Sequence, residues 1–192
     1  MLKWDMESEE KPSTPPSLLG PPSSSWAELA LADETLAQLH DLADRVVEAR
    51  GSSSKGIDGS TSHGVVALFT GGARPPKLVA AQVLAGRLGA ELVNVDVAAL
   101  ISQYIGETEK NLSRLFAAAE ESDTVLFLDE ADALFGERTD EKDAHGRYQN
   151  QEVDYLLGRI EGYSGLVILA TNSPQEPGLA LVRRKAIEVT FT

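Results

Sequence analysis

From Val65 onward, short apolar runs alternate with stretches of helical periodicity, and this alternation is the strongest constraint on the fold. The rhythm is typical of βαβ units, in which helices cover both faces of a mostly parallel sheet. Strands covered on both faces are apolar almost throughout, and several of these runs have that character. The expected strands are 65–70, 91–95, 124–129, 166–171 and 186–191, and the expected helices are 77–88, 107–121 and 146–162. We therefore predict an α/β protein.

The residues before Val65 fall into three segments of different composition. Residues 1–27 are rich in Ser and Pro and have little to bury, so we expect a disordered arm. Residues 28–50 carry apolar side chains at three- and four-residue spacing, which predicts one amphipathic helix. Residues 51–64 contain nine Gly or Ser among fourteen, the composition of a flexible linker. The globular core is then expected to span 65–192.

Composition and charge exclude several classes of partner and site. The chain has 30 acidic and 17 basic side chains, a formal net charge of −13 and no basic patch, so we do not expect nucleic acid as a partner. It has no cysteine and only scattered histidines, which excludes disulfides, zinc thiolates and a thiol nucleophile. No apolar run approaches the ~20 residues that span a bilayer. We therefore expect no membrane contact and a cytoplasmic location.

Two acidic residues follow directly on the apolar run VLFL. Asp129 and Glu130 are thereby placed at the carboxyl end of an expected strand, where open α/β sheets bind their ligands. Asp129 could bind Mg²⁺ directly or through water, and Glu130 could polarise an attacking water as a general base. The alternative is a strand that runs into an acidic, solvated loop.

The segment GGARPPKL, after the first expected strand, is the candidate phosphate-binding loop. The pattern G-x-x-x-x-G-K-[ST] requires a glycine before the lysine and a hydroxyl after it. This chain has Gly71, Gly72 and Lys77, but Pro76 and Leu78 occupy the second glycine and the hydroxyl positions. Prolines have no N–H, and hydrogen bonds to charged groups contribute roughly 1.5–3 kcal/mol each, so we expect about 10- to 10⁴-fold weaker phosphate binding. The alternative is a tight strand-to-helix turn with a solvated lysine.

Two further polar positions flank the last expected strands. Asn172 follows the fourth strand, where it could orient a water or contact a γ-phosphate, although a lone Asn after a strand is more often a turn residue. Arg183 and Arg184 precede the last strand. They could reach the phosphate site of a neighbouring subunit, or they could form a basic surface turn.

Taken in order, these segments resemble the large ATP-binding subdomain of the AAA+ ATPases, in particular bacterial remodelling ATPases related to the Cdc48 and FtsH group. The segment ISQYIGETEKNLSRLFAAAEES resembles the pore loop and its following helix, LFLDEADALFG the Walker B motif, and ILATN the sensor 1 strand. The resemblance implies a P-loop NTPase fold, a three-layer αβα sandwich with a five-stranded, mostly parallel sheet, here preceded by an N-terminal helix. It also implies nucleotide held between neighbouring subunits of a homo- or hetero-oligomeric ring, if a lid is supplied.

The resemblance also implies roles for individual residues. Asp129 and Glu130 match the Walker B pair, with Asp129 as the Mg²⁺ ligand, Asn172 matches sensor 1, and Arg184 is the best match to the arginine finger. The nucleotide-binding positions are Gly71, Gly72, Lys77, Leu78 and Asp129, and Tyr104, Ile105 and Gly106 match the pore loop that grips an extended polypeptide. The sequence stops after the last expected strand, so the helical lid of the family is not expected in it.

The function implied is an ATP-binding and ATP-hydrolysing module for protein remodelling, with ATP and Mg²⁺ as cofactors and a protein as substrate. The altered loop predicts weakened nucleotide binding and low or absent hydrolysis in this chain. One alternative is an inactive AAA+ scaffold or regulatory subunit that contributes Arg184 to an active partner. Another is an ATP-independent interaction module that docks through helix 28–50. The nucleotide interpretation requires Lys77, Asp129 and Asn172 to converge.

Overall fold

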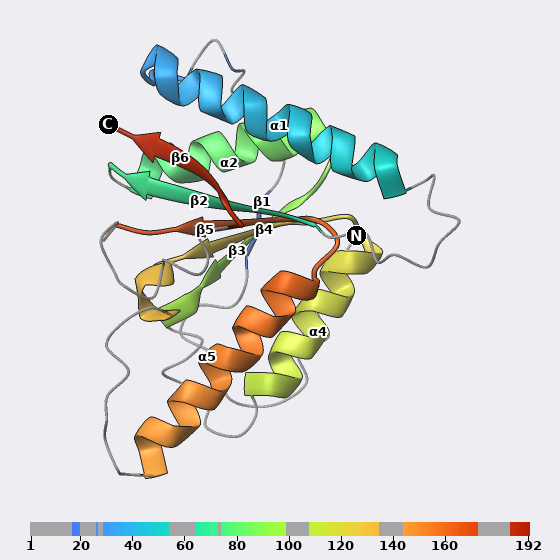
Figure 1. Cartoon of the computed structure of the whole chain (residues 1–192), viewed down its shortest axis with the longest axis vertical. Coiled ribbons are helices and arrows are strands. Elements are labelled where there is room, and N and C mark those ends of the chain that lie inside the picture. Colours follow the sequence, from blue (N-terminus) through green and yellow to red (C-terminus); the bar gives the residue numbers. More distant parts are fainter. Residues whose placement is uncertain are drawn as a thin grey trace.

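The computed structural model describes residues 17–19, 26, 29–53, 64–72, 74–98, 108–134, 144–172 and 185–192. Its described part forms three layers, in which one central sheet is covered by helices on both faces (Figure 1). Helices α1 (Asp33–Ser53) and α2 (Arg74–Leu88) cover one face, and α4 (Thr108–Glu121) and α5 (Ala144–Gly162) cover the other. The predicted αβα sandwich is confirmed.

Among the described residues, the sheet has six strands in the order β1-β3-β4-β5-β2-β6. Their bounds are β1 Ser17–Leu19, β2 Val65–Gly71, β3 Leu92–Asp96, β4 Val125–Asp129, β5 Leu166–Ala170 and β6 Ile187–Phe191. Strands β2 to β6 pair in parallel, as predicted. Their carboxyl ends therefore meet at one edge of the sheet, where the arrowheads gather in Figure 1.

The core has one apolar cluster on each face of the sheet, because successive side chains of a strand point to opposite faces. Leu126 and Leu128 of β4 lie in the cluster that also contains Phe116 of α4 and Ile160 of α5. Phe127, between them, lies in the cluster formed with α1 and α2. All five residues of β4 and all five of β5 are buried, which explains why their sequences are almost wholly apolar.

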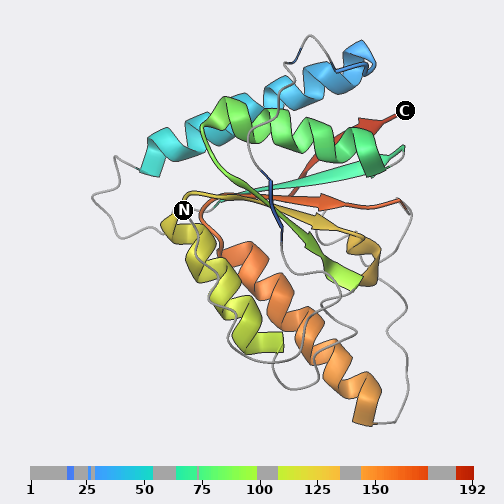
Figure 2. The same ribbon diagram turned by 180° about the vertical axis from the view of Figure 1, so that it is seen from behind.

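Helix α1 is part of the core, which corrects the prediction that the core begins at Val65. Its apolar stripe of Leu39, Leu42, Ala43 and Val46 is at most 2% exposed and packs in the cluster of β2, β5 and α2. At its amino end, the Thr35 hydroxyl donates to the Thr190 carbonyl of β6 at 2.7 Å. The helix therefore covers the sheet and the outer edge of β6 rather than presenting its apolar stripe to a partner (Figure 2).

Strand β1 was not expected, because residues 1–27 were predicted to be disordered. Ser17–Leu19 pair antiparallel with β3, in the register Ser17 to Asn94 and Leu19 to Leu92. Nearby in sequence, the ring of Trp26 stacks on His40 of α1 with 4.6 Å between centroids. The prediction of disorder is wrong at Ser17–Leu19. The edge of β3 presents backbone N–H and C=O groups with which a neighbouring segment can pair, whatever the composition of that segment.

Candidate nucleotide site

Polar side chains from three elements converge at the carboxyl edge of the sheet. They come from the first turn of α2, from the end of β4 with its following 3₁₀ helix η2 (Ala131–Leu134), and from the end of β5. Strand pairing brings these ends together, since β4 lies between β3 and β5 and β5 lies beside β2. The convergence of Lys77, Asp129 and Asn172 that the sequence required is present.

Lys77 is at the centre of this group. Its side chain is buried, at 1% exposure, and its ammonium donates to the Thr171 carbonyl at 2.7 Å and to Asn172 Oδ1 at 2.9 Å. Burial lowers the pKa of Lys77 from its usual value of 10.5, while the carboxylates of Asp129 and Asp132 oppose that shift. The alternative of a merely solvated lysine is therefore wrong.

Asp132 of η2 binds the same two residues. The Thr171 hydroxyl donates to Asp132 Oδ1, and the Asn172 backbone N–H donates to Asp132 Oδ2 at 3.2 Å. Thr171 and Asn172 are thus hydrogen-bonded both to a carboxylate and to an ammonium group. Asn172 is consequently more than a turn residue, since both its backbone and its side chain are held by the site.

Asp129 and Glu130 differ in exposure and backbone conformation. Asp129 is 5% exposed at the end of β4, and its Oδ1 accepts a hydrogen bond from the Glu130 N–H at 3.0 Å. Glu130 is exposed and has a φ of 53°, which is in the left-handed region that a non-glycine residue rarely adopts. Strain of this kind is often found at functional sites, where surrounding structure maintains it. The chain therefore turns sharply at Glu130 and leaves its carboxylate available to solvent.

The turn from β2 to α2 depends on two consecutive glycines. Gly71 and Gly72 have φ values of 69° and 55°. A Cβ atom at Gly71 would lie 2.4 Å from the Phe191 carbonyl oxygen of β6, and one at Gly72 would lie 3.0 Å from the Phe191 Cβ. This position therefore requires glycine, both for conformation and for space.

The two prolines after this turn lie in the first turn of α2, which begins at Arg74. Proline is tolerated there, because the first N–H groups of a helix have no partner inside it. Those same N–H groups are the donors that bind phosphate at a helix amino terminus, and Pro75 and Pro76 do not have them. Next to Lys77, Leu78 packs against the cluster of α1, α2 and β2 and offers no hydroxyl. The turn keeps its place in the fold but has fewer groups that could bind an anion.

These contacts test how well the residues fit a Mg²⁺-bound triphosphate. Asp129 provides the single carboxylate that Mg²⁺ uses together with water and phosphate oxygens, so the metal position fits. The phosphate cradle does not fit, because two helix N–H donors are replaced by proline, the hydroxyl is replaced by Leu78, and Lys77 already has two protein acceptors. Within the described ranges, no group of three or more His, Cys, Asp or Glu side chains is placed to hold a metal on its own.

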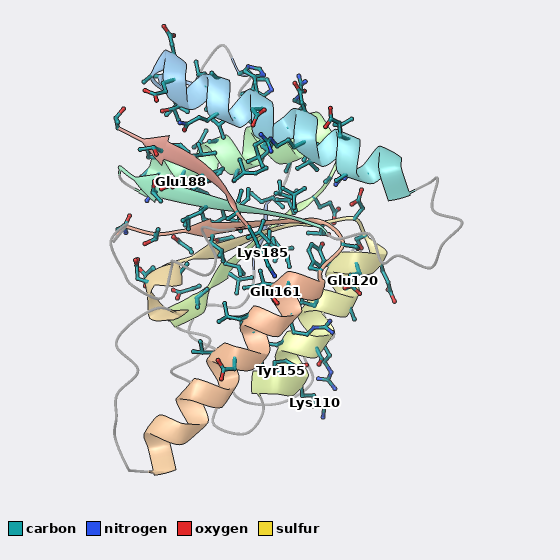
Figure 3. All side chains as sticks on the ribbon, viewed as in Figure 1. Lys110, Glu120, Tyr155, Glu161, Lys185 and Glu188 are labelled. Atoms are coloured by element: carbon teal, nitrogen blue, oxygen red, sulfur yellow. The ribbon has the colours of Figure 1, made fainter. Side chains whose placement is uncertain are left out.

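Five of the sequence-predicted residues lie outside the described part of the chain. They are Tyr104, Ile105, Gly106, Arg183 and Arg184. Their roles stay predictions. Lys185, which follows Arg184, is described and pairs with Glu161 at the end of α5, with 3.2 Å between Nζ and Oε1 (Figure 3). It lies before β6 begins, at the amino edge of the sheet and therefore opposite Asp129.

Sequence reasoning missed two residues of the site, Asp132 and Thr171. Asp132 belongs to the acidic stretch that drew attention to Asp129, but an acidic residue in a loop has no specific signal by itself. Asp132 follows Asp129 by three residues, and it stays at the sheet edge because η2 is a tight 3₁₀ turn. Thr171 reads as the last residue of an apolar strand, and only the fold shows its hydroxyl bonded to Asp132.

Comparison with known proteins agrees with this architecture. A family model described as "ATPase family associated with various cellular activities (AAA)" matches residues 68–192. Spastin of Drosophila mojavensis is 37% identical over 113 residues, which are 56% of this chain and 15% of spastin. Cell division protein C of Sulfolobus acidocaldarius is 32% identical over 117 residues, which are 56% of this chain and 31% of that protein.

A solved structure shows the same fold. The crystal structure of the FIGL-1 AAA domain in complex with ADP superposes with a TM-score of 0.67 and 23% identity, covering 93% of this chain and 59% of that domain. This chain thus spans less than two thirds of each of these relatives. No helix among the described residues is both long and apolar enough to cross a membrane. With the family model matching more than half of its length, the chain belongs to the AAA ATPase family.

Proposed function

We propose that this chain is an AAA module of a protein-remodelling assembly whose own site binds Mg²⁺-ATP weakly and hydrolyses it slowly or not at all. Spastin, cell division protein C and the ADP-bound FIGL-1 domain are the relatives that favour a nucleotide and a remodelling role. The single observation that carries the weakened binding is the first turn of α2, where Pro75 and Pro76 replace N–H donors. On this proposal a protein is the substrate and the assembly is an oligomeric ring.

The polar half of the site supports a residual nucleotide function. Asp129 would hold Mg²⁺, Glu130 would orient and deprotonate water, and Asn172 would position that water or a phosphate oxygen. Lys77 would be the charged contact to phosphate. Gly71 and Gly72, which have no side chains, would let the backbone of the turn come close to the phosphate. These residues converge without a complete cradle, so affinity rather than the presence of reacting groups is expected to limit the activity.

A second candidate function is the donation of Arg184 to a neighbouring subunit. Lys185, the next residue along the chain, lies at the amino edge of the sheet, opposite Asp129. An arginine finger supplied in trans acts on a neighbour's nucleotide, so this role does not require a working site in this chain. In such an assembly this chain would act as a regulatory subunit even with an inactive site of its own.

The interaction-module alternative is not favoured. It required the apolar stripe of helix 28–50 to be free for a partner, but Leu39, Leu42 and Val46 are buried against the sheet. In addition, an inert sheet gives no reason for a buried Lys77 held at a strand end. The nucleotide interpretation gives a reason for the buried Lys77.

Two measurements on the purified chain test the proposed function. The first is the dissociation constant for Mg²⁺-ATP by calorimetry. We expect it to be about 0.1 to 1 mM, roughly 100- to 1,000-fold weaker than a site that binds near 1 μM, since each lost donor weakens binding by about 10-fold or more. The second is Mg²⁺-dependent phosphate release, compared between the native chain and Glu130→Gln. Slow release that Glu130→Gln abolishes supports a residual ATPase, and nucleotide binding without release supports the regulatory role.

Exposed Glu121 at the end of α4 provides the matched control. Glu121→Gln removes an equal charge, but it lies before the amino end of β4, whereas Glu130 follows the carboxyl end. It should leave binding and release unchanged. Tight binding with a dissociation constant near 1 μM would contradict the weakened site. The absence of any binding at 10 mM ATP, both alone and with a neighbouring AAA subunit, would contradict nucleotide function altogether.

A further inference from the structure

Asp132 is one of two site residues, with Thr171, to which neither the sequence nor the family match assigns a role. It lies on η2, three residues after Asp129, and its carboxylate is half-buried beside the end of β5. From this placement we propose that Asp132 is a positioning residue, which holds Thr171 and Asn172 so that they retain the Lys77 ammonium and keep it from an incoming phosphate.

Asp132 contacts the two residues that follow β5. Its two carboxylate oxygens are used separately, since Oδ1 accepts from the Thr171 hydroxyl and Oδ2 accepts from the Asn172 N–H at 3.2 Å. Hydrogen bonds to a charged acceptor are about twice as strong as neutral ones. A two-point contact of this kind fixes both the position and the direction of the strand end.

This strand end is also linked to Lys77. The two residues that Asp132 holds are the same two that accept from the Lys77 ammonium, through the Thr171 carbonyl at 2.7 Å and Asn172 Oδ1 at 2.9 Å. Lys77 is 1% exposed in this arrangement. Asp132 is therefore linked to Lys77 through Thr171 and Asn172, by a continuous chain of hydrogen bonds.

These hydrogen bonds have a consequence for an anion. A phosphate at this edge must compete with Thr171 and Asn172 for the Lys77 ammonium, and it also approaches the negative charge of Asp132. Removing the carboxylate would weaken both obstacles. It would also free Asn172, so the side chain proposed to orient water would lose its fixed position.

This mechanism predicts opposite effects on binding and on positioning, which a purely structural role does not. If Asp132 only stabilised the fold, its loss would weaken nucleotide binding along with everything else. If it positions Asn172 and retains Lys77, its loss should strengthen anion binding while it loosens the strand end. The binding part rests on the proposed function, whereas the positioning part does not.

The positioning part is tested on the nucleotide-free chain with Asp132→Asn, which keeps the size and removes the charge and one acceptor. Hydrogen exchange measured by NMR should accelerate by about 10-fold or more at the Asn172 amide and at the Lys77 ammonium, because each loses part of its support. Amides of α1 and α5 should keep their rates, which shows that the fold is intact. Asp44→Asn is the matched control, since Asp44 pairs with Arg87 on the exposed side of α1.

Thr171→Val provides a second variant that avoids any change at Asp132. It removes the hydroxyl and keeps the backbone carbonyl that accepts from Lys77. Because both changes break the same connection, their effects on Asn172 exchange should be non-additive in the double variant. Unchanged exchange at both Asn172 and Lys77 in Asp132→Asn would overturn the proposal, as would full additivity.

The binding part is tested with a fluorescent ATP analogue on the same proteins. Asp132→Asn should bind it about 3- to 10-fold more tightly than the native chain, whereas Asp44→Asn should not differ. Weaker binding in Asp132→Asn with an unchanged melting temperature would overturn the retention of Lys77. If neither protein binds the nucleotide, the proposed function fails, and hydrogen exchange alone still decides whether Asp132 positions Asn172 and Lys77.

Discussion

The turn from β2 to α2 and the ends of β4 and β5 face each other across one site, but they are built to different degrees of completeness. The β4 and β5 ends supply side chains, and Asp129, Asp132 and Asn172 all have defined partners or charges there. The turn should supply backbone N–H donors, and two of its residues are prolines. The comparison shows that polar side chains at the ends of β4 and β5 can converge beside a turn in which two residues have no backbone N–H.

The fold explains why this is possible. Pro75 and Pro76 occupy the first turn of α2, where the helix does not use their N–H groups, and Leu78 gains apolar contacts in the core. Two prolines and a leucine at these positions are therefore compatible with folding. Folding and anion binding place different requirements on this turn. The helix needs only its own hydrogen bonds, whereas an anion needs the N–H donors that the helix leaves free.

The largest stability effect is expected at the residue that joins the two halves. Lys77→Met should lower the free energy of unfolding by about 3 kcal/mol, because Thr171 and Asn172 lose a donor and the carboxylates of Asp129 and Asp132 lose their nearby positive charge. Urea unfolding of the two proteins measures it. Lys110→Met, on the exposed surface of α4, is the control and should change stability by less than about 0.5 kcal/mol. A similarly small loss for Lys77→Met would break the comparison.

A smaller effect is expected in the turn itself. Gly71→Ala should cost about 2 kcal/mol or more, because φ is 69° and the new Cβ would lie 2.4 Å from the Phe191 carbonyl oxygen. Gly89→Ala is a matched control for conformation alone, with a φ of 65° and no atom within 4 Å of the new Cβ, and should cost about 1 kcal/mol. Equal losses in thermal unfolding would show that the close approach to β6 does not constrain the turn.

Much of the fold was predictable from the sequence, for a reason that β4 illustrates. Every residue of β4 and β5 is buried, so their continuous apolar runs identified them directly. Helix α2, in contrast, begins at Arg74 rather than at 77, because prolines that usually stop a helix are accepted in its first turn. The three residues of β1 carry little local signal, and their strand exists because the edge of β3 is free to pair.

The site was predictable only in part. Lys77, Asp129 and Asn172 follow apolar strands at the same edge, so parallel topology alone brings them together. The burial of Lys77 and the link from Asp132 to Thr171 are tertiary, since they join residues 94 and 39 positions apart in the sequence. No periodicity or motif could reveal which polar groups pair across that distance.

The smallest effect concerns the pH dependence of stability near pH 10. Burial lowers the pKa of Lys77 below 10.5, so the unfolded chain binds more protons just below pH 10.5 and stability should rise with pH in that window. At the opposite edge of the sheet, the Tyr163 hydroxyl donates to the Thr124 carbonyl. Burial of Tyr163 raises its pKa above the usual 10.0, and the negative charges of Asp123 and Glu120 raise it further. The folded chain therefore keeps this proton longer, and stability should fall as pH rises above 10.0.

Variants separate the two opposing slopes, each of which is at most about 1.4 kcal/mol per pH unit. Lys77→Met should remove the rise, and Tyr163→Phe should remove the fall. Urea unfolding between pH 8 and 11 measures both. A native chain whose alkaline profile is changed by neither variant would show that these two groups do not titrate as described.

Calorimetric titration of Mg²⁺-ATP into the native chain and into Pro76→Gly with Leu78→Thr tests the central claim most directly. The double change returns one N–H donor and one hydroxyl to the turn while it leaves Asp129, Asp132 and Asn172 untouched. We predict about 100-fold tighter binding, which corresponds to roughly 2.7 kcal/mol, in a variant that remains folded. An unchanged dissociation constant in a folded variant would contradict the claim that missing donors in this turn limit the site.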